Sequence, residues 1–215
     1  MNVNAKSFYL ILFLSIFIVL PTILFIFVDI PSRTILKNIL SIITILAFFI
    51  VLGQFFVSRI NESIKTIFNA SKLIKVHKIL GYVVLPILLF HPILIVVPRF
   101  FEAGPDPFDS FIKMITTFDS LSIILGLIAW VLMLLLGLTA MLRNKLNIKY
   151  KSWKIFHGIL SLIFIIFASY HAIETGRHMN LIMSIVVLFL TLFASLLLLK
   201  AYLFNKKKTE TKGLV

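Results

Sequence analysis

Long runs of apolar residues alternate with short segments that carry nearly all of the charge. Six of these runs have about 20 residues or slightly more, enough for an α-helix to cross ~30 Å of hydrocarbon. The pattern predicts six transmembrane helices, at about residues 8–28, 35–57, 76–97, 121–142, 153–173 and 180–204. The first run is longer than the apolar core of a signal peptide and is not followed by a small-residue cleavage site, so we interpret it as a retained span.

The composition excludes several classes of protein. Sixty per cent of the 215 residues are hydrophobic and 13% are charged, whereas soluble domains are typically about 45–50% apolar and about 25% charged. A soluble enzyme and a disordered tail are therefore excluded. Cysteine is absent, which excludes disulfides, Cys-ligated zinc, iron–sulfur clusters and covalently attached haem. We expect one all-α membrane domain at residues 1–205, followed by a basic cytoplasmic tail at residues 206–215.

The basic residues are distributed unevenly between the loops. If both termini lie on one side of the membrane, 16 of the 21 Lys and Arg residues fall on that side and five on the other. Loops with an excess of Lys and Arg face the cytoplasm. We therefore expect a multi-pass protein of the cell membrane with both termini cytoplasmic and with parallel third and fifth spans. This placement explains the net charge of +13, so nucleic acid is not expected as a partner.

Four of the five histidines pair by position. His77 and His91 lie on the third predicted span, and His157 and His171 lie on the fifth, each pair 14 residues apart. Fourteen residues come within about 40° of four full turns, so each pair shares one helix face and is separated by about 21 Å along the helix. Because the two spans are parallel, His77 is expected level with His157 near the inner edge of the membrane. His91 is expected level with His171 near the outer edge.

Ionisable residues inside a membrane are costly and mark functional sites. Two stacked pairs of imidazoles suit two b-type haems, each ligated axially by one histidine from each span. Zinc is disfavoured, because each level offers two nitrogens where zinc takes three or four protein ligands. Two axial histidines leave no open position on the iron, so electron transfer is expected and no catalytic residue is predicted. Phe164, midway between His157 and His171, is either a core residue or a ring between the haems.

Other residues near the two levels have less specific patterns. Small residues beside the histidines, such as Gly81 and Gly158, allow close approach either of a porphyrin or of another helix. The third span is expected to bend near His91 because of Pro86 and Pro92. Four cations are candidates for contacts with haem propionates or the electron acceptor, unless they only anchor the spans: Lys78 and Lys154 at the inner level, and Arg99 and Arg177 at the outer level.

Three segments outside the spans also lead to expectations. His178 lies just beyond the fifth span and is interpreted as a surface residue. The loop at residues 98–119 is expected to fold over the outer level as a lid. Residues 58–75 have apolar residues at helical spacing between lysines. This segment is either an interfacial helix on anionic headgroups or a docking surface for a cytoplasmic partner.

Four short motifs resemble the ferric reductase-like transmembrane domain, which includes ferric reductases and NADPH oxidases. They are Lys75-Val-His77-Lys-Ile-Leu-Gly81, Phe90-His91-Pro92, Trp153-Lys-Ile-Phe-His157-Gly158 and Tyr170-His171. The resemblance implies a six-helix bundle with two haems b between the third and fifth helices. It also implies an oxidoreductase haem subunit that exports electrons from a cytoplasmic flavin to an extracytoplasmic acceptor such as ferric iron or oxygen.

The resemblance departs from the full-length enzymes in one respect. Ferric reductases and NADPH oxidases continue into a domain that binds FAD and NAD(P)H, whereas these 215 residues contain no Gly-rich dinucleotide motif. FAD or FMN is therefore expected only on a separate flavoprotein donor. Three alternatives remain: the haem subunit of a methionine sulfoxide reductase-type system, a quinol-linked diheme cytochrome b, and a transporter that uses histidines for protons or metal ions. The presence of His77 favours the ferric reductase branch over the first of these.

Overall fold

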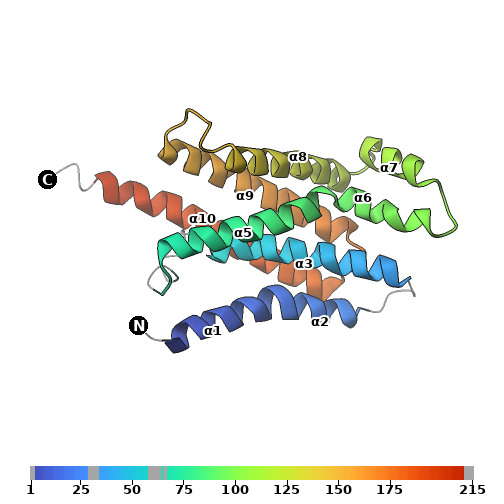
Figure 1. Cartoon of the computed structure of the whole chain (residues 1–215), viewed down its shortest axis with the longest axis horizontal. Coiled ribbons are helices and arrows are strands. Elements are labelled where there is room, and N and C mark those ends of the chain that lie inside the picture. The colour runs from blue at the N-terminus through green and yellow to red at the C-terminus, as the bar shows by residue number, and fades with distance from the viewer. Residues whose placement is uncertain (1–2, 29–33, 58–63, 65–66, 211–215) are drawn as a thin grey trace.

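The computed structural model describes residues 3–28, 34–57, 64 and 67–210, with the backbone alone for residue 3 and residues 203–210. Every regular element in this part of the chain is helical, which confirms the predicted all-helical class. The elements, shown in Figure 1, are α1 (Val3–Leu14), the π-helical turn η1 (Ser15–Val19), α2 (Leu20–Ile26), α3 (Ile35–Val57), α5 (Ala70–Leu89), α6 (His91–Val96), the 3-10 turn η2 (Val97–Phe100), α7 (Pro107–Thr116), α8 (Leu121–Met141), α9 (Tyr150–Thr175) and α10 (Leu181–Glu210).

Five of the described helical stretches are long and apolar enough to cross a membrane, and a sixth candidate is bent. The bent candidate joins α5 to α6 and η2 at an angle of 47°. Some helices extend beyond the predicted spans. Hydropathy marks only the part of a helix that lies in hydrocarbon, whereas the backbone hydrogen bonds of the helix continue to its capping residue. α5, for example, begins six residues earlier than predicted, after Asn69, whose side chain accepts from the Ser71 N–H at 3.1 Å. Of the amphipathic segment predicted at 58–75, residues 58–63, 65 and 66 lie outside the described residues, and residues 70–75 form the start of α5.

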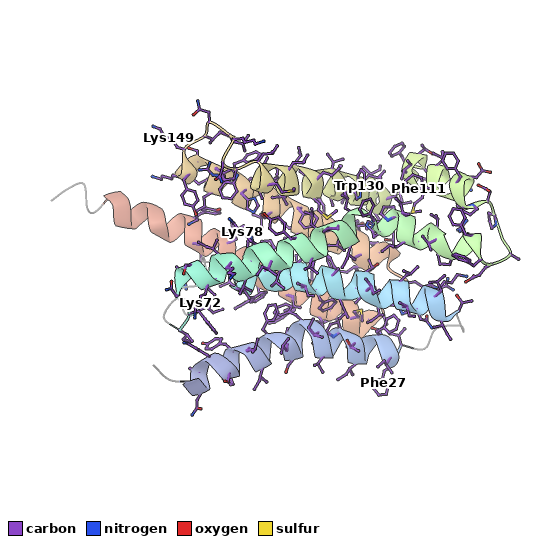
Figure 2. All side chains as sticks on the ribbon, viewed as in Figure 1. Phe27, Lys72, Lys78, Phe111, Trp130 and Lys149 are labelled. Atoms are coloured by element: carbon purple, nitrogen blue, oxygen red, sulfur yellow. The ribbon has the colours of Figure 1, made fainter. Side chains whose placement is uncertain are left out.

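The bend between α5 and α6 confirms the effect predicted for the two prolines. Pro92 has no N–H to donate to the carbonyl of Leu88 four residues earlier, so the helical ladder is interrupted there. At the same bend, the carbonyl of Leu89 accepts a hydrogen bond from Nε1 of Trp130 on α8 at 2.8 Å. Figure 2 shows Trp130 on α8 close to this bend. The bend is therefore fixed by a contact with a second helix.

The helices form one bundle, and its packing leaves the histidine-bearing helices apart. α8 packs along α9, α3 along α5, and α10 against both α9 and α3. Within the described residues, α5 and α9 have no extended packing against each other. The buried core contains Phe49, Leu52 and Ile165, while the outward faces expose many large apolar side chains, as lipid-facing surfaces do. The beginning of α1 and the end of α10 lie at the same end of the bundle (Figure 1).

Candidate functional site

Two cavities occupy the space between α5–α6 and α9, and each is lined by two of the four paired histidines. Cavity I has a volume of about 790 Å³ and is lined by His77 of α5 and His157 of α9. Cavity II has a volume of about 630 Å³ and is lined by His91 of α6 and His171 of α9. The structure therefore brings the histidines together in the pairs expected from their spacing.

One aromatic side chain lines both cavities. Phe164 of α9 is 6% exposed and lines both cavities, together with Met133 of α8. Phe164 also packs in the central hydrophobic core. Phe164 therefore packs in the core and also lies between the two cavities, so the two alternatives predicted for it do not exclude each other.

The histidines of cavity II are oriented by backbone carbonyls. Nδ1 of His91 lies 2.6 Å from the carbonyl oxygen of Leu88, and Nδ1 of His171 lies 2.9 Å from that of Ser122. A carbonyl can only accept, so each Nδ1 donates its hydrogen and leaves Nε2 as the nitrogen with a free lone pair. The carbonyl of Leu88 is available to His91 because Pro92, four residues later, has no N–H to donate to it.

The position of His171 also depends on a glycine in the neighbouring helix. A Cβ atom at Gly126 of α8 would lie 2.3 Å from Nδ1 of His171. That distance is far inside van der Waals contact, so only glycine allows the imidazole to lie against α8 at this point. Gly126 stands one turn after Ser122, whose carbonyl accepts from the same ring. Gly126 and Ser122 together fix the position of the His171 ring.

Cavity I contains buried polar atoms without hydrogen-bond partners. These are Nδ1 of His77, Nδ1 of His157, Nε of Arg143 and Nε1 of Trp153, and all four residues line the cavity. The Trp153 ring stacks on His157 at 5.0 Å, and the guanidinium of Arg143 lies 5.3 Å from the Trp153 ring. Buried polar groups in proteins nearly always have partners. Arg143 and Trp153 can only donate, so the four unsatisfied atoms indicate a place for a ligand whose groups include acceptors.

The four cations singled out from the sequence line the expected cavities. Lys78 and Lys154 line cavity I, as does Arg143, and no acidic residue in the described part of the chain does so. Cavity II is lined by Arg99 and Arg177. It is also lined by Lys37 and Glu102, which form an ion pair.

The loop at residues 98–119 contributes to cavity II in part. Residues 98 and 99 and residues 102–105 line the cavity, so the first half of the loop covers this level as expected. The second half forms α7, which has no buried residue and packs against α6 and η2. Arg99 donates to the hydroxyl of Ser110 on α7, which ties the two halves together.

The structure corrects the interpretation of His178 as a surface residue. His178 is only 7% exposed, stacks on Phe25 of α2 at 4.3 Å between ring centroids and lines cavity II. The residue that covers it lies about 150 positions earlier in the chain. Sequence position beside the fifth span could not reveal this contact.

The small residues beside the histidines have different roles. A Cβ at Gly158 would lie 1.7 Å from the hydroxyl of Tyr202, so Gly158 serves the approach of α10 to α9. A Cβ at Gly81 would meet no protein atom closer than 3.9 Å, and Gly81 lines cavity I. Gly81 therefore leaves space in the cavity. Gly126, Trp130 and Arg143 were not singled out from the sequence, because their role depends on contacts between helices.

The described residues contain pairs of histidines and no larger group of metal-binding side chains. Among the described residues, no group of three or more His, Asp or Glu side chains converges at metal-binding distance. Each cavity instead presents two imidazoles from separate helices across a largely apolar space. This arrangement suits a flat apolar group held between two axial ligands.

Fold and site thus define a multi-pass helical membrane protein with two stacked, histidine-flanked cavities. Residues 39–168 match the family described as ferric reductase like transmembrane component. The chain is also 38% identical over 167 residues to a protein of Archaeoglobus fulgidus named only as uncharacterized, covering 78% of this chain and 91% of that protein. No solved structure matches it. The chain belongs to the ferric reductase-like transmembrane component family, as its motifs predicted. The matched region includes His77, His91 and His157 and ends three residues before His171.

Proposed function

We propose that the chain carries electrons across the membrane through two bis-histidine haems b. The donor is a reduced flavin on the cytoplasmic side, and the acceptor is an extracytoplasmic oxidant such as ferric iron or oxygen. Membership of the family indicates a component of transmembrane electron transfer. The observation that carries the proposal is the pair of stacked cavities, each with one histidine from each of two helices.

The residues present fit a haem in each cavity. Both volumes lie within the ~300–1,000 Å³ of small-molecule and cofactor sites. His77 and His157 would hold the haem of cavity I, and His91 and His171 that of cavity II. The unsatisfied donors of Arg143 and Trp153 suit acidic groups at the edge of a porphyrin. When bound, a haem supplies reversible one-electron chemistry.

The protein would contribute position and environment to this transfer. Two histidines, one from each helix, would hold each haem, and a haem held in this way would favour outer-sphere electron transfer over the binding of a small ligand. Phe164 would lie between the two haems, because it lines both cavities. Electrons that leave a negative interior gain about 2.3 kcal/mol per 100 mV for a full crossing. Outward flow is thus favoured by the membrane potential.

Absorption spectroscopy and haem quantification test the proposal directly. Protein purified from haem-replete cells should show a Soret band and the reduced-minus-oxidised spectrum of bis-histidine haem b, with two haems per chain. A preparation without a Soret band would overturn the proposal. It would favour the transporter in which the histidines move protons or metal ions.

The charge distribution gives an expectation for orientation. Lys72, Lys78 and Lys149 lie toward the end of the bundle where α1 begins and α10 ends (Figures 1 and 2). We propose that this end faces the cytoplasm. Tags at both termini should resist protease added to intact cells and be cleaved after permeabilisation. A tag inserted at Gly104, in the loop at the opposite end, should be cleaved from outside. Cleavage of a terminal tag in intact cells would reverse the orientation and the direction of electron flow.

The proposed donor is a flavoprotein with an acidic docking surface, because cations concentrate at the end next to cavity I. A reduced flavin reductase should reduce the haems, and the rate should fall as ionic strength rises. Lys149→Gln should weaken this salt dependence, whereas Lys113→Gln on α7, at the other end, should not. A rate that is independent of salt and of both lysines would contradict docking at this end. NADPH alone should leave the haems oxidised.

A further inference from the structure

The short helix α7 lies at the end of the bundle remote from the start of α1, and none of its residues is buried. It packs against α6 and η2, which form the last part of the third span. Residues 117–120 lead from it to Leu121, where α8 begins. Figure 2 shows Phe111 of α7 at this end of the bundle. Because one span ends just before α7 and the next begins just after it, α7 lies at an edge of the membrane.

The side chains of α7 divide into an apolar face and a polar face. At about 100° per residue, four large apolar side chains fall within an arc of about 100°. They are Phe108, Phe111, Ile112 and Ile115. The exposed polar residues Asp109, Lys113 and Thr116 share another side of the helix. This division is typical of a helix that lies in the plane of a membrane surface.

Apolar side chains on both sides of α7 in the chain are exposed as well. Phe108 is 69% exposed, and Phe101, shortly before the helix, is 77% exposed. Phe100, Phe118 and Leu121 are each more than half exposed. Since Leu121 belongs to a span, these side chains continue the apolar surface that the bundle presents to lipid. Exposure of this area to water would be unfavourable, so the surface requires an apolar neighbour.

The charges of α7 indicate which part of a lipid it meets. The charged residues in the helix and at its cap are Asp106, Asp109 and Lys113, so acids exceed bases by one. The Asp106 carboxylate is held in the cap, where it accepts from the N–H groups of Phe108 and Asp109 at 2.8 and 3.1 Å. Helices that bind anionic headgroups carry an excess of Lys and Arg. α7 has no such excess, which leaves burial of its apolar face as the source of attraction.

We propose that α7 is an interfacial helix, with its apolar face among the lipid acyl chains just below the headgroups and its polar face in water. Such a face lies about 5–10 Å into the boundary between headgroups and acyl chains. Arg99 of η2 donates to the hydroxyl of Ser110 and joins α7 to the third span. Residues 103–105, which line cavity II, lead directly into α7. The rim of cavity II therefore lies at the level of the headgroups, with or without haem in the cavity.

Spin labels on single cysteines test this position, because the chain has no cysteine of its own. Labels on Phe108→Cys and Ile112→Cys probe the apolar face, and labels on Asp109→Cys and Lys113→Cys probe the polar face. The full chain is placed in phosphatidylcholine nanodiscs, and electron paramagnetic resonance measures collisions of each label with O₂ and with a charged nickel chelate. O₂ enters hydrocarbon, whereas the chelate stays in water. The ratio of O₂ to chelate collisions should be several-fold higher on the apolar face.

Three other results would overturn the proposal. Frequent chelate collisions on both faces would show that α7 stands in water. Few collisions with either reagent at Phe108→Cys and Ile112→Cys would show that a second copy of the chain covers the apolar face. A high ratio that appears only after phosphatidylglycerol is added would show that anionic headgroups, and not acyl chains, hold the helix.

A matched pair of aspartate substitutions tests the cause of the anchoring. With the label on Phe108→Cys, Ile112→Asp places a charge on the apolar face and should lower the collision ratio several-fold. Lys113→Asp, at the next residue, places the same side chain on the polar face and should leave the ratio unchanged. Equal falls from both substitutions would contradict anchoring by the apolar face.

Discussion

Replacing any one of the four paired histidines with alanine is expected to lower the haem content from two to one per chain. Each haem needs both axial ligands, and the two ligand pairs line separate cavities. Haem quantification on purified variants measures this effect. His178→Ala is the matched control, because His178 is also buried and lines cavity II but faces Phe25. That variant should retain two haems.

Double variants test the pairing itself. His77→Ala with His157→Ala removes both ligands from cavity I and should leave one haem. His77→Ala with His171→Ala removes one ligand from each cavity and should leave none. The opposite pattern would show that the histidines pair diagonally and would refute the two-level arrangement.

Gly126→Ala is expected to remove the haem of cavity II. The added methyl group would lie 2.3 Å from Nδ1 of His171 and force the imidazole away from the Ser122 carbonyl. Alanine is favoured over glycine in a helix by about 1 kcal/mol, so a defect would not come from helix propensity. The measurement is the haem content in a His77→Ala background, where only the cavity II haem remains. That content should fall close to zero.

Gly137→Ala provides the control for this substitution. Gly137 lies on the same helix, and a Cβ there would meet the terminal carbons of Leu85 at 2.9 Å, which a flexible side chain can relieve. In the same background it should keep the cavity II haem. Equal loss from both glycine substitutions would point to a general effect on α8 and contradict a specific role for Gly126.

The main architecture could be predicted from the sequence because it depends on local patterns. Hydropathy defined the spans, since a helix in lipid must be apolar over its whole length. The 14-residue spacing placed His77 level with His157 because helical rise and parallel direction are fixed quantities. Pro92 marked the bend because a missing N–H removes one hydrogen bond from the helical ladder.

What could not be predicted depends on contacts between distant segments. Gly126 against His171, Trp130 against the Leu89 carbonyl and Phe25 against His178 each join different helices. No local periodicity encodes which face of α8 meets which residue of α9. The incorrect interpretation of His178 has this cause, since its burial results from the packing of α2 against the end of the bundle.

Because α5 and α9 are separated by the two cavities, the stability of the folded protein should depend on the availability of the ligand that fills them. Within the described residues these helices have no extended packing on each other and are joined through α8, which packs against both. A ligand that binds only the folded state stabilises it by RT ln(1 + [L]/Kd), about 4 kcal/mol at a thousandfold excess over Kd. With haems as the occupants, a cell short of haem would hold a looser chain exposed to membrane proteolysis. The amount of the protein in the cell would then fall when haem is scarce, without a dedicated regulator.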